Sequence, residues 1–269
     1  MNAILRLTCR DRRGIVAAIT NFIAHNNGNI VNLDQYTDPA AGQFFMRLEW
    51  DLKNFKIAPA KIEKALQKFG KISVTFSNRQ KRAAVFVSRY DHCLYDLLLR
   101  QRSGELNCDI AAVISNHEDL RYVAAAFGKE FYCLPGAEKK QLALLKEKKI
   151  DLIVLARYMQ ILSPVFIRDY LYKIINVHHS FLPAFKGAKP YHQAYRRGVK
   201  IIGATAHFAT EDLDQGPIIQ QNVAQISHRD TVDDLIVKGR DLERQVLSEA
   251  VRYFLNDRLF VRGNRTIIL

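Results

Sequence analysis

The chain has 269 residues, 48% of them hydrophobic and 25% charged, which is ordinary for a globular protein of one large domain or two. No apolar run approaches the roughly 18 residues of a membrane span, and the first residues lack the apolar core and cleavage site of a signal peptide. The four cysteines are widely spaced, which indicates reduced thiols rather than disulfides or a metal site. We therefore expect a cytoplasmic protein with no membrane partner.

The net charge of +13 is spread over the whole chain. Residues 1–82 carry 14 Lys/Arg against 6 Asp/Glu, and residues 83–269 carry 26 against 21. A solvated basic surface explains this balance most simply, and an anionic small substrate is the next explanation. Nucleic acid is not an expected partner, because no recognised binding motif accompanies the charge.

The first 80 residues alternate between strand-like and helical patterns. A turn at residues 11–14 (DRRG) precedes a helix that ends near Asn26-Asn27-Gly28, and a second helix fits residues 59–69. The predicted strands are residues 3–9, 29–37, 43–51 and 72–77. The order βαββαβ is that of a ferredoxin-like unit, so we predict a first domain over residues 1–80 and a linker within 77–82.

From residue 83 to residue 269, apolar strands alternate with helical segments. This alternation predicts an α/β domain with a Rossmann-like, mostly parallel sheet. The predicted strands are 83–88, 109–115, 151–156, 173–177 and 201–208, and the predicted helices are 93–102, 118–127, 138–149, 164–170, 189–197 and 231–255.

Two motifs follow apolar runs of this second domain: residues 176–183 (NVHHSFLP) and residues 207–217 (HFATEDLDQGP). Side chains that follow strands in an α/β fold usually line the crevice where ligands bind. In an extended segment, Asn176 and His178 point to one face. Together with Asp214 they supply an amide, an imidazole and a carboxylate. This set can stabilise an oxyanion, move a proton and orient the group that moves it.

Each of these residues also has a structural explanation. His178 could be a strand-end histidine satisfied by its neighbours, and Asp214 could cap a turn before Gly216. Their joint occurrence in the two motifs favours catalysis. His179 points the other way and is expected to be structural, and His207 is expected to be a supporting residue more than a catalyst.

At these motifs, residues 83–269 resemble the formyltransferase fold of folate-dependent glycinamide ribonucleotide transformylase. The motifs match its Asn-x-His and Asp, which implies Asn176, His178 and Asp214 as catalytic residues. Residues 155–164 (LARYMQILSP) resemble the folate-pocket segment of that fold. The implied substrate-binding residues are Leu155, Tyr158, Met159, Gln160, Ile161, Leu162, His207, Thr210 and Asp212.

Residues 3–78 resemble an ACT domain, with residues 11–16 (DRRGIV) at its usual first turn. An ACT domain followed by a formyltransferase domain is the architecture of the formyltetrahydrofolate deformylase family. Residues 92–98 (HCLYDLL), 102–106 (RSGEL) and 263–266 (GNRT) also resemble that family. The resemblance implies a homo-oligomer and a small amino-acid effector, glycine or methionine. The turn at residues 11–14 is explained equally well as a plain connection between strand and helix. The implied effector residues are Asp11, Arg12, Gly14 and Ile15.

The activity that this resemblance implies is hydrolysis of 10-formyltetrahydrofolate to tetrahydrofolate and formate. It would supply formate for purine synthesis and balance one-carbon pools, without a cofactor or a metal. Asn176 would donate a hydrogen bond to the tetrahedral oxyanion, and a protonated His178 would stabilise the same charge. The residues do not decide whether His178 or Asp214 is the formal general base.

One departure from the transformylase pattern favours water as the formyl acceptor. The transformylase holds its substrate's phosphate on a Gly-rich loop after the first strand, because glycine lets backbone N–H groups approach the anion. Here residues 88–93 read SRYDHC. Formyl transfer to an amine is the alternative activity. A basic RNA- or metabolite-binding regulator with a degenerate enzyme domain is a third reading, and it would require loss of a catalytic residue.

Overall fold

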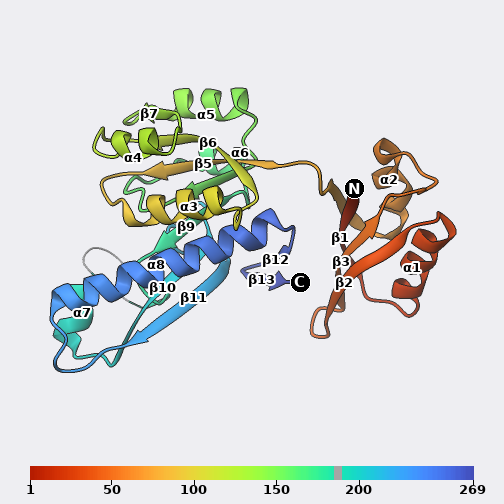
Figure 1. The fold of residues 1–269 in the computed structure, drawn as a ribbon. Helices are drawn as coiled ribbons and strands as arrows, with labels where there is room; N and C mark the ends of the chain where they lie inside the picture. The colour runs from red at the N-terminus through yellow and green to blue at the C-terminus, as the bar shows by residue number, and fades with distance from the viewer. Residues whose placement is uncertain (185–189) are drawn as a thin grey trace. The chain divides into compact units, whose positions relative to one another are not determined.

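The computed structural model describes residues 1–184 and 190–269, which form two compact units (Figure 1). Unit 1 contains residues 1–80, 256–260 and 267–269, and unit 2 contains residues 81–255 and 261–266. No helix in the described ranges has both the length and the apolar character needed to cross a membrane.

Unit 1 is a four-stranded antiparallel sheet with two helices, in the strand order β2-β3-β1-β4. The apolar sides of α1 and α2 pack on one face of this sheet, in a single core that includes Ile19, Ile62 and Trp50. Its elements are β1 (Asn2–Arg10), α1 (Ile15–His25), β2 (Asn29–Asp38), β3 (Gln43–Asp51), α2 (Pro59–Leu66), the 3-10 turn η1 (Gln67–Phe69) and β4 (Lys71–Phe76). The order βαββαβ and the ferredoxin-like fold are confirmed.

The C-terminal residues of the chain belong to unit 1, which corrects the predicted domain 83–269. Phe260 and Leu269 bury their side chains against Phe45 of β3, and the guanidinium of Arg6 lies 4.9 Å from the centre of the Phe260 ring. Thr75 donates a hydrogen bond of 2.8 Å to the Asp257 carboxylate. Burial of this apolar surface draws the chain end to unit 1. The sequence pattern did not reveal this long-range packing.

Unit 2 is built on a nine-stranded sheet in the order β12-β13-β11-β10-β9-β8-β5-β6-β7. The pairs β6·β7, β5·β6, β5·β8, β8·β9 and β11·β13 are parallel, whereas β10 is antiparallel to both β9 and β11. The strands are β5 (Lys81–Val87), β6 (Cys108–Ser115), β7 (Phe131–Cys133), β8 (Leu152–Leu155), β9 (Ile174–His178), β10 (Ile201–Phe208), β11 (Ile218–Gln225), β12 (Leu259–Arg262) and β13 (Arg265–Ile268). The predicted mostly parallel α/β sheet is confirmed.

Helices cover both faces of this sheet (Figure 1). On one face α5 and α6 pack against β5, β6 and β8, with Phe86 and Phe166 at the centre of the core. On the other face α8 contacts β9, β10 and β11 and packs beside α3 and α7. The helices are α3 (His92–Ser103), α4 (Arg121–Ala126), α5 (Glu138–Glu147), α6 (Pro164–Asp169), α7 (Pro190–Arg197) and α8 (Val232–Leu255).

The strands β7, β11, β12 and β13 were not predicted. Half of the eight residues of strand β11 are polar and only one is buried, so its composition gives little strand signal. The predicted linker over residues 77–82 is too long, because β5 already begins at Lys81. Lys81 and Arg82 pair with Cys108 and Asp109 of β6 in the sheet ladder. Residue 189, the predicted start of one helix, lies outside the described residues.

Candidate active site

A cavity of about 740 Å³ opens in unit 2 beside β8, β9 and β10. It contains the three predicted catalytic residues and every predicted substrate-binding residue except one. The predicted residues that line it are Leu155, Tyr158, Met159, Gln160, Ile161, Leu162, Asn176, His178, His207, Thr210 and Asp214. Asp212 does not line the cavity. Its side chain is exposed, and its carbonyl accepts a hydrogen bond of 3.1 Å from the Thr210 hydroxyl.

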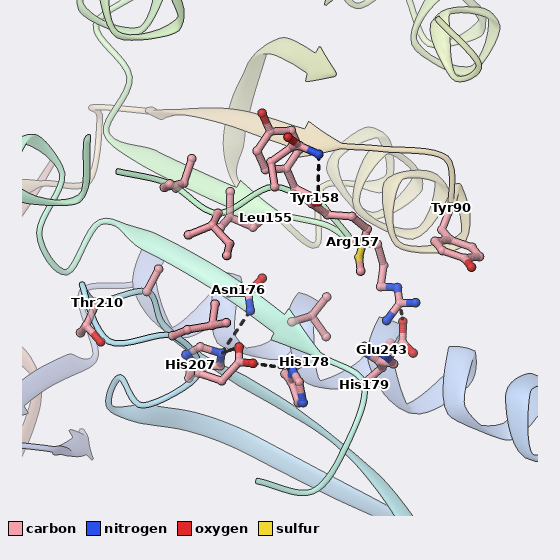
Figure 2. A pocket seen from close by; sticks show the side chains of 18 of the residues that line it. Tyr90, Leu155, Arg157, Tyr158, Asn176, His178, His179, His207, Thr210 and Glu243 are labelled. Atoms are coloured by element: carbon pink, nitrogen blue, oxygen red, sulfur yellow. Dashed lines mark hydrogen bonds and ion pairs between the residues drawn. The ribbon is translucent and has the colours of Figure 1, made fainter. Parts of the chain in front are cut away.

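The antiparallel register of β9 and β10 brings the first two polar side chains together. Asn176 lies directly opposite His207, and residues that are paired in this way project to the same face of a sheet. The Asn176 Nδ2 and the His207 Nε2 are 3.1 Å apart (Figure 2). His178 lies two residues along β9, so it projects to this face as well. The prediction that Asn176 and His178 share one face is confirmed.

Asp214 reaches this pair of strands from the loop after β10. The loop is held to the strand by a hydrogen bond of 2.9 Å from the Phe208 N–H to the Pro217 carbonyl. Gly216 allows this approach, because a Cβ atom there would lie only 1.8 Å from the Phe208 carbonyl oxygen. Asp214 has φ 55°, a left-handed conformation that aspartate tolerates better than most residues. The loop therefore presents the carboxylate to the strand face.

The Asp214 carboxylate lies between two histidines. One oxygen is 3.3 Å from the His178 Nδ1, and the other is 3.6 Å from the His207 Nε2. Burial alone would raise the pKa of Asp214, but the hydrogen-bonding contacts with His178 and His207 outweigh it and hold the pKa well below its usual range. The carboxylate therefore stays ionised at neutral and moderately acidic pH.

The two histidines have different freedom to react. The His207 Nδ1 lies 2.9 Å from the Phe208 carbonyl, so its N–H donates there, and His207 is only 2% exposed. His207 thus fits the supporting position that the sequence suggested. The His178 Nε2, by contrast, is buried without a hydrogen-bond partner among the described residues, on a side chain that lines the cavity. A buried polar atom of this kind is free to bind a substrate group.

The predicted folate segment forms the apolar part of the cavity. Tyr158 and Leu162 are almost fully buried, and Tyr158 packs edge-on against Phe86. Met159 and Ile161 are more than half exposed, as is Leu213 across the cavity. The Ser88 hydroxyl, just after β5, accepts a hydrogen bond of 3.0 Å from the Met159 N–H and so fixes the segment. Exposed apolar side chains around a cavity are typical of a binding site for an aromatic ligand.

A second polar cluster lines the cavity, and the sequence did not predict it. Glu243 of α8 is 1% exposed. One of its oxygens lies 2.8 Å from the His92 Nε2 and 3.5 Å from the Arg157 Nε, and the other accepts a hydrogen bond of 2.8 Å from the Tyr191 hydroxyl. The Arg157 guanidinium also lies 4.8 Å from the centre of the Tyr90 ring. These five residues are called the Glu243 network below.

The charges of the Glu243 network compensate each other. Burial would raise the pKa of Glu243, but the hydrogen bond from His92 and the charge of Arg157 lower it overall.

Arg157, with φ 62° and 9% exposure, comes from the loop after β8. Gly239 makes room for Tyr191, because a Cβ atom on Gly239 would lie 2.1 Å from the Tyr191 hydroxyl. A glycine within a helix lowers helix stability, so packing explains its presence here.

His92, Cys93 and Glu243 bring possible metal-ligand atoms within 4.8 Å of one another. The donor set does not suit a metal, since the His92 Nε2 and both Glu243 oxygens already have protein partners. Burial, and then the charge of Glu243, raise the pKa of the Cys93 thiol well above its usual value, whereas a metal-bound cysteine must be a thiolate.

Comparison with known proteins places this geometry in a family. Residues 81–251 match the model of the formyl transferase family, and residues 3–70 match the model of the ACT domain. The chain is also similar to the crystal structure of glycinamide ribonucleotide transformylase 1 from Symbiobacterium toebii, with 31% identity and a TM-score of 0.69 over 72% of this chain and 96% of that one. The chain belongs to the formyl transferase family.

Relatives that match along the full length narrow this class. The chain is 51% identical to the formyltetrahydrofolate deformylase of Synechocystis sp., covering 100% of this chain and 98% of the relative. It is 44% identical to that of Bacillus subtilis, covering 98% and 92%. The crystal structure of a formyltetrahydrofolate deformylase from Pseudomonas syringae pv. tomato shares 43% identity and a TM-score of 0.97, covering 100% of this chain and 94% of that one. Within the family, the chain is thus a member of the formyltetrahydrofolate deformylases.

His179 gives a pH-dependence of stability that can be measured. Burial, and then the charge of Arg157, lower its pKa to about 3, whereas an unfolded histidine titrates near 6.5. Between these values the unfolded chain binds a proton that the folded chain does not, so stability falls as the pH drops from about 6.5 toward 3. In His179→Gln the thermal midpoint of unfolding should fall less steeply over this window. Equal slopes for the two proteins would show that His179 carries no such penalty.

Proposed function

We propose that this protein hydrolyses 10-formyltetrahydrofolate to tetrahydrofolate and formate. The observation that carries the proposal is the His178 Nε2, which is buried without a described partner in the cavity while its Nδ1 faces the Asp214 carboxylate. The names of the full-length relatives supply the substrate. In this function the enzyme would release formate for purine synthesis and regulate the one-carbon pool, in the cytoplasm.

The proposed reaction begins with the pterin in the apolar part of the cavity, against Met159, Ile161 and Leu213. This position brings the formyl group on N10 to the centre, between Asn176 and His178. Asn176 has two N–H groups on Nδ2. One faces the His207 Nε2, and the other is left for the formyl oxygen. One hydrogen-bond donor at an oxyanion typically lowers the activation barrier by about 3–4 kcal/mol.

His178 performs the proton transfers in this proposal. Its Nδ1–H faces Asp214, so the neutral ring offers the Nε2 lone pair to a water molecule. The water oxygen bonds to the formyl carbon, its proton moves to the His178 Nε2, and the carbonyl electrons form the oxyanion beside Asn176. When the C–N10 bond breaks, His178 returns the proton to N10, and formic acid loses its own proton to solvent. These steps require no metal and no cofactor.

The direct test is formate release in buffer without an amine. Purified protein and 10-formyltetrahydrofolate should give formate and tetrahydrofolate in equal amounts, because water is the acceptor. Formyl transfer, the alternative activity, would leave the substrate intact until an amine is added. Absence of formate under these conditions would exclude hydrolysis.

Replacing Asp214 with Asn should lower kcat by roughly 100- to 10,000-fold, the usual contribution of an acid–base group. The amide keeps the size of the side chain but removes the charge that orients and stabilises His178. The loss should appear in kcat with little change in folate affinity, since the pterin contacts lie elsewhere. Asp212→Asn is the matched control, because that exposed carboxylate on the same loop lies outside the cavity. A D214N enzyme that keeps more than about a tenth of wild-type kcat would contradict this mechanism.

We further propose that unit 1 assembles the protein and binds a small amino acid, glycine or methionine. Strand β2 is ten residues long, lies at the edge of its sheet and is largely exposed, which favours pairing with a second copy. Asp11, Arg12 and Gly14 are exposed before α1, and no side chain caps that helix, so N–H groups of its first turn can donate hydrogen bonds to a carboxylate. The side chain of Ile15 is in the core and its N–H donates to the Arg12 carbonyl at 3.4 Å, so Ile15 is the least available of the predicted effector residues.

Two measurements test the proposal for unit 1. Sedimentation velocity at micromolar concentration should show an oligomer. The thermal midpoint of unfolding or the rate of formate release should shift when millimolar glycine or methionine is added. The double substitution Asp11→Ala and Arg12→Ala should reduce the response and leave the assembly intact, because these exposed side chains precede α1. A monomer would contradict assembly, and the same midpoint and rate with both amino acids would contradict effector binding.

A further inference from the structure

We propose that the Glu243 network determines the acceptor: it occupies the side of the cavity from which an amine would attack, and Arg157 is the residue that reserves this position for water. The inference rests on the proposed hydrolysis and concerns its specificity. It starts from the arrangement of the cavity. Figure 2 shows Thr210 at one end, Tyr90, Arg157 and Glu243 at the other, and Asn176, His178 and His207 between them.

In the proposed binding mode the folate lies against the apolar residues of the cavity, and the formyl carbon at its centre presents its free side to Arg157 and Glu243. A nucleophile has to approach from there, because the other side is covered by the folate itself. The Arg157 guanidinium is fixed in this space by Glu243 on one side and by the Tyr90 ring on the other. Since both Arg157 and Glu243 are at least nine-tenths buried, moving the guanidinium aside would take the one arginine charge away from a buried carboxylate and leave it only His92 and Tyr191.

Two of the residues that build this obstruction, Tyr90 and His92, stand where a phosphate-binding loop would be expected. After β5 the chain contributes Tyr90, which stacks against Arg157, and His92, which holds Glu243. Tyr191 completes the network through its hydroxyl. Bulky side chains therefore replace an open loop at this place, and each is tied to another by a contact within the network. In this proposal these side chains leave room for water but not for a larger amine.

Arg157 also has a group to offer to a water molecule. Its Nη1 is buried and has no hydrogen-bond partner among the described residues. A buried donor of this kind favours a small molecule that accepts a hydrogen bond, and the nucleophilic water is such a molecule. Arg157 thus excludes a larger acceptor and offers a position for the smaller one.

Arg157→Gly tests the proposal without strain, because φ 62° is readily adopted by glycine. Wild-type and variant are incubated with 10-formyltetrahydrofolate and increasing glycinamide, and formate and N-formylglycinamide are both quantified. In the transfer, the C–N10 bond breaks, a bond from the formyl carbon to the amine nitrogen forms, and the amine proton replaces the formyl group on N10. We expect the ratio of N-formylglycinamide to formate to rise by about tenfold or more in R157G, the lower end of what pocket shape discriminates.

Two controls make the result specific. Lys149 is also a cationic residue with positive φ, but it is exposed and lies outside the cavity. Lys149→Gly should therefore behave as wild-type. Arg157→Lys keeps the charge and most of the volume and should still exclude the amine. Tyr90→Ala removes the stacking partner of Arg157 at a 43% exposed position, so it provides a second variant if R157G does not fold.

The outcomes separate this proposal from the proposed function. If wild-type releases no formate, hydrolysis itself is wrong. If wild-type releases formate and the variants that bind folate still form no N-formylglycinamide, the Glu243 network does not select the acceptor. If wild-type or R157K forms as much N-formylglycinamide as R157G does, the proposal for the Glu243 network is overturned as well.

Discussion

The Asp214 carboxylate, held between His178 and His207, is the interaction on which the site depends. It requires the register that places Asn176 opposite His207, and it requires a loop that returns to β10 closely enough for glycine alone to fit at position 216. Because each carboxylate oxygen faces one histidine, rotation of either ring would leave one oxygen of this partly buried carboxylate without its partner. The carboxylate therefore fixes the tautomer and direction of His178 as much as it supplies charge.

A second buried carboxylate, Glu243, organises the opposite side of the same cavity. Its partners are a guanidinium, an imidazole and a phenol from three other segments, so its position depends on the packing of the whole unit. His179 lies near Arg157 and is kept neutral in the physiological range by burial and by that cation. A neutral His179 adds no positive charge beside Arg157 on this side of the cavity.

The end of the chain shows how far local sequence can mislead about domains. Phe260 and Leu269 form a cluster with Phe45 of unit 1, although the 175 residues 81–255 of unit 2 lie between them and residues 1–80. Strands β12 and β13 are joined by Gly263 and Asn264 alone, a two-residue connection typical of a hairpin. That signal was present in the sequence. The partner Phe45 was not, because packing against a distant strand has no local pattern.

The pairing of Asn176 and His178 on one face was predictable for a reason that does not extend to the rest of the cavity. Asn176 and His178 lie on a strand, where a period of two determines which side chains share a face. Asp212 lies on a loop, which has no such period, so spacing could not show that its side chain does not line the cavity. Arg157 and Glu243 are 86 residues apart and meet only after β8 and α8 are packed. The shared face of Asn176 and His178 was therefore readable from a local motif, whereas the Glu243 network depends on contacts that exist only in the folded chain.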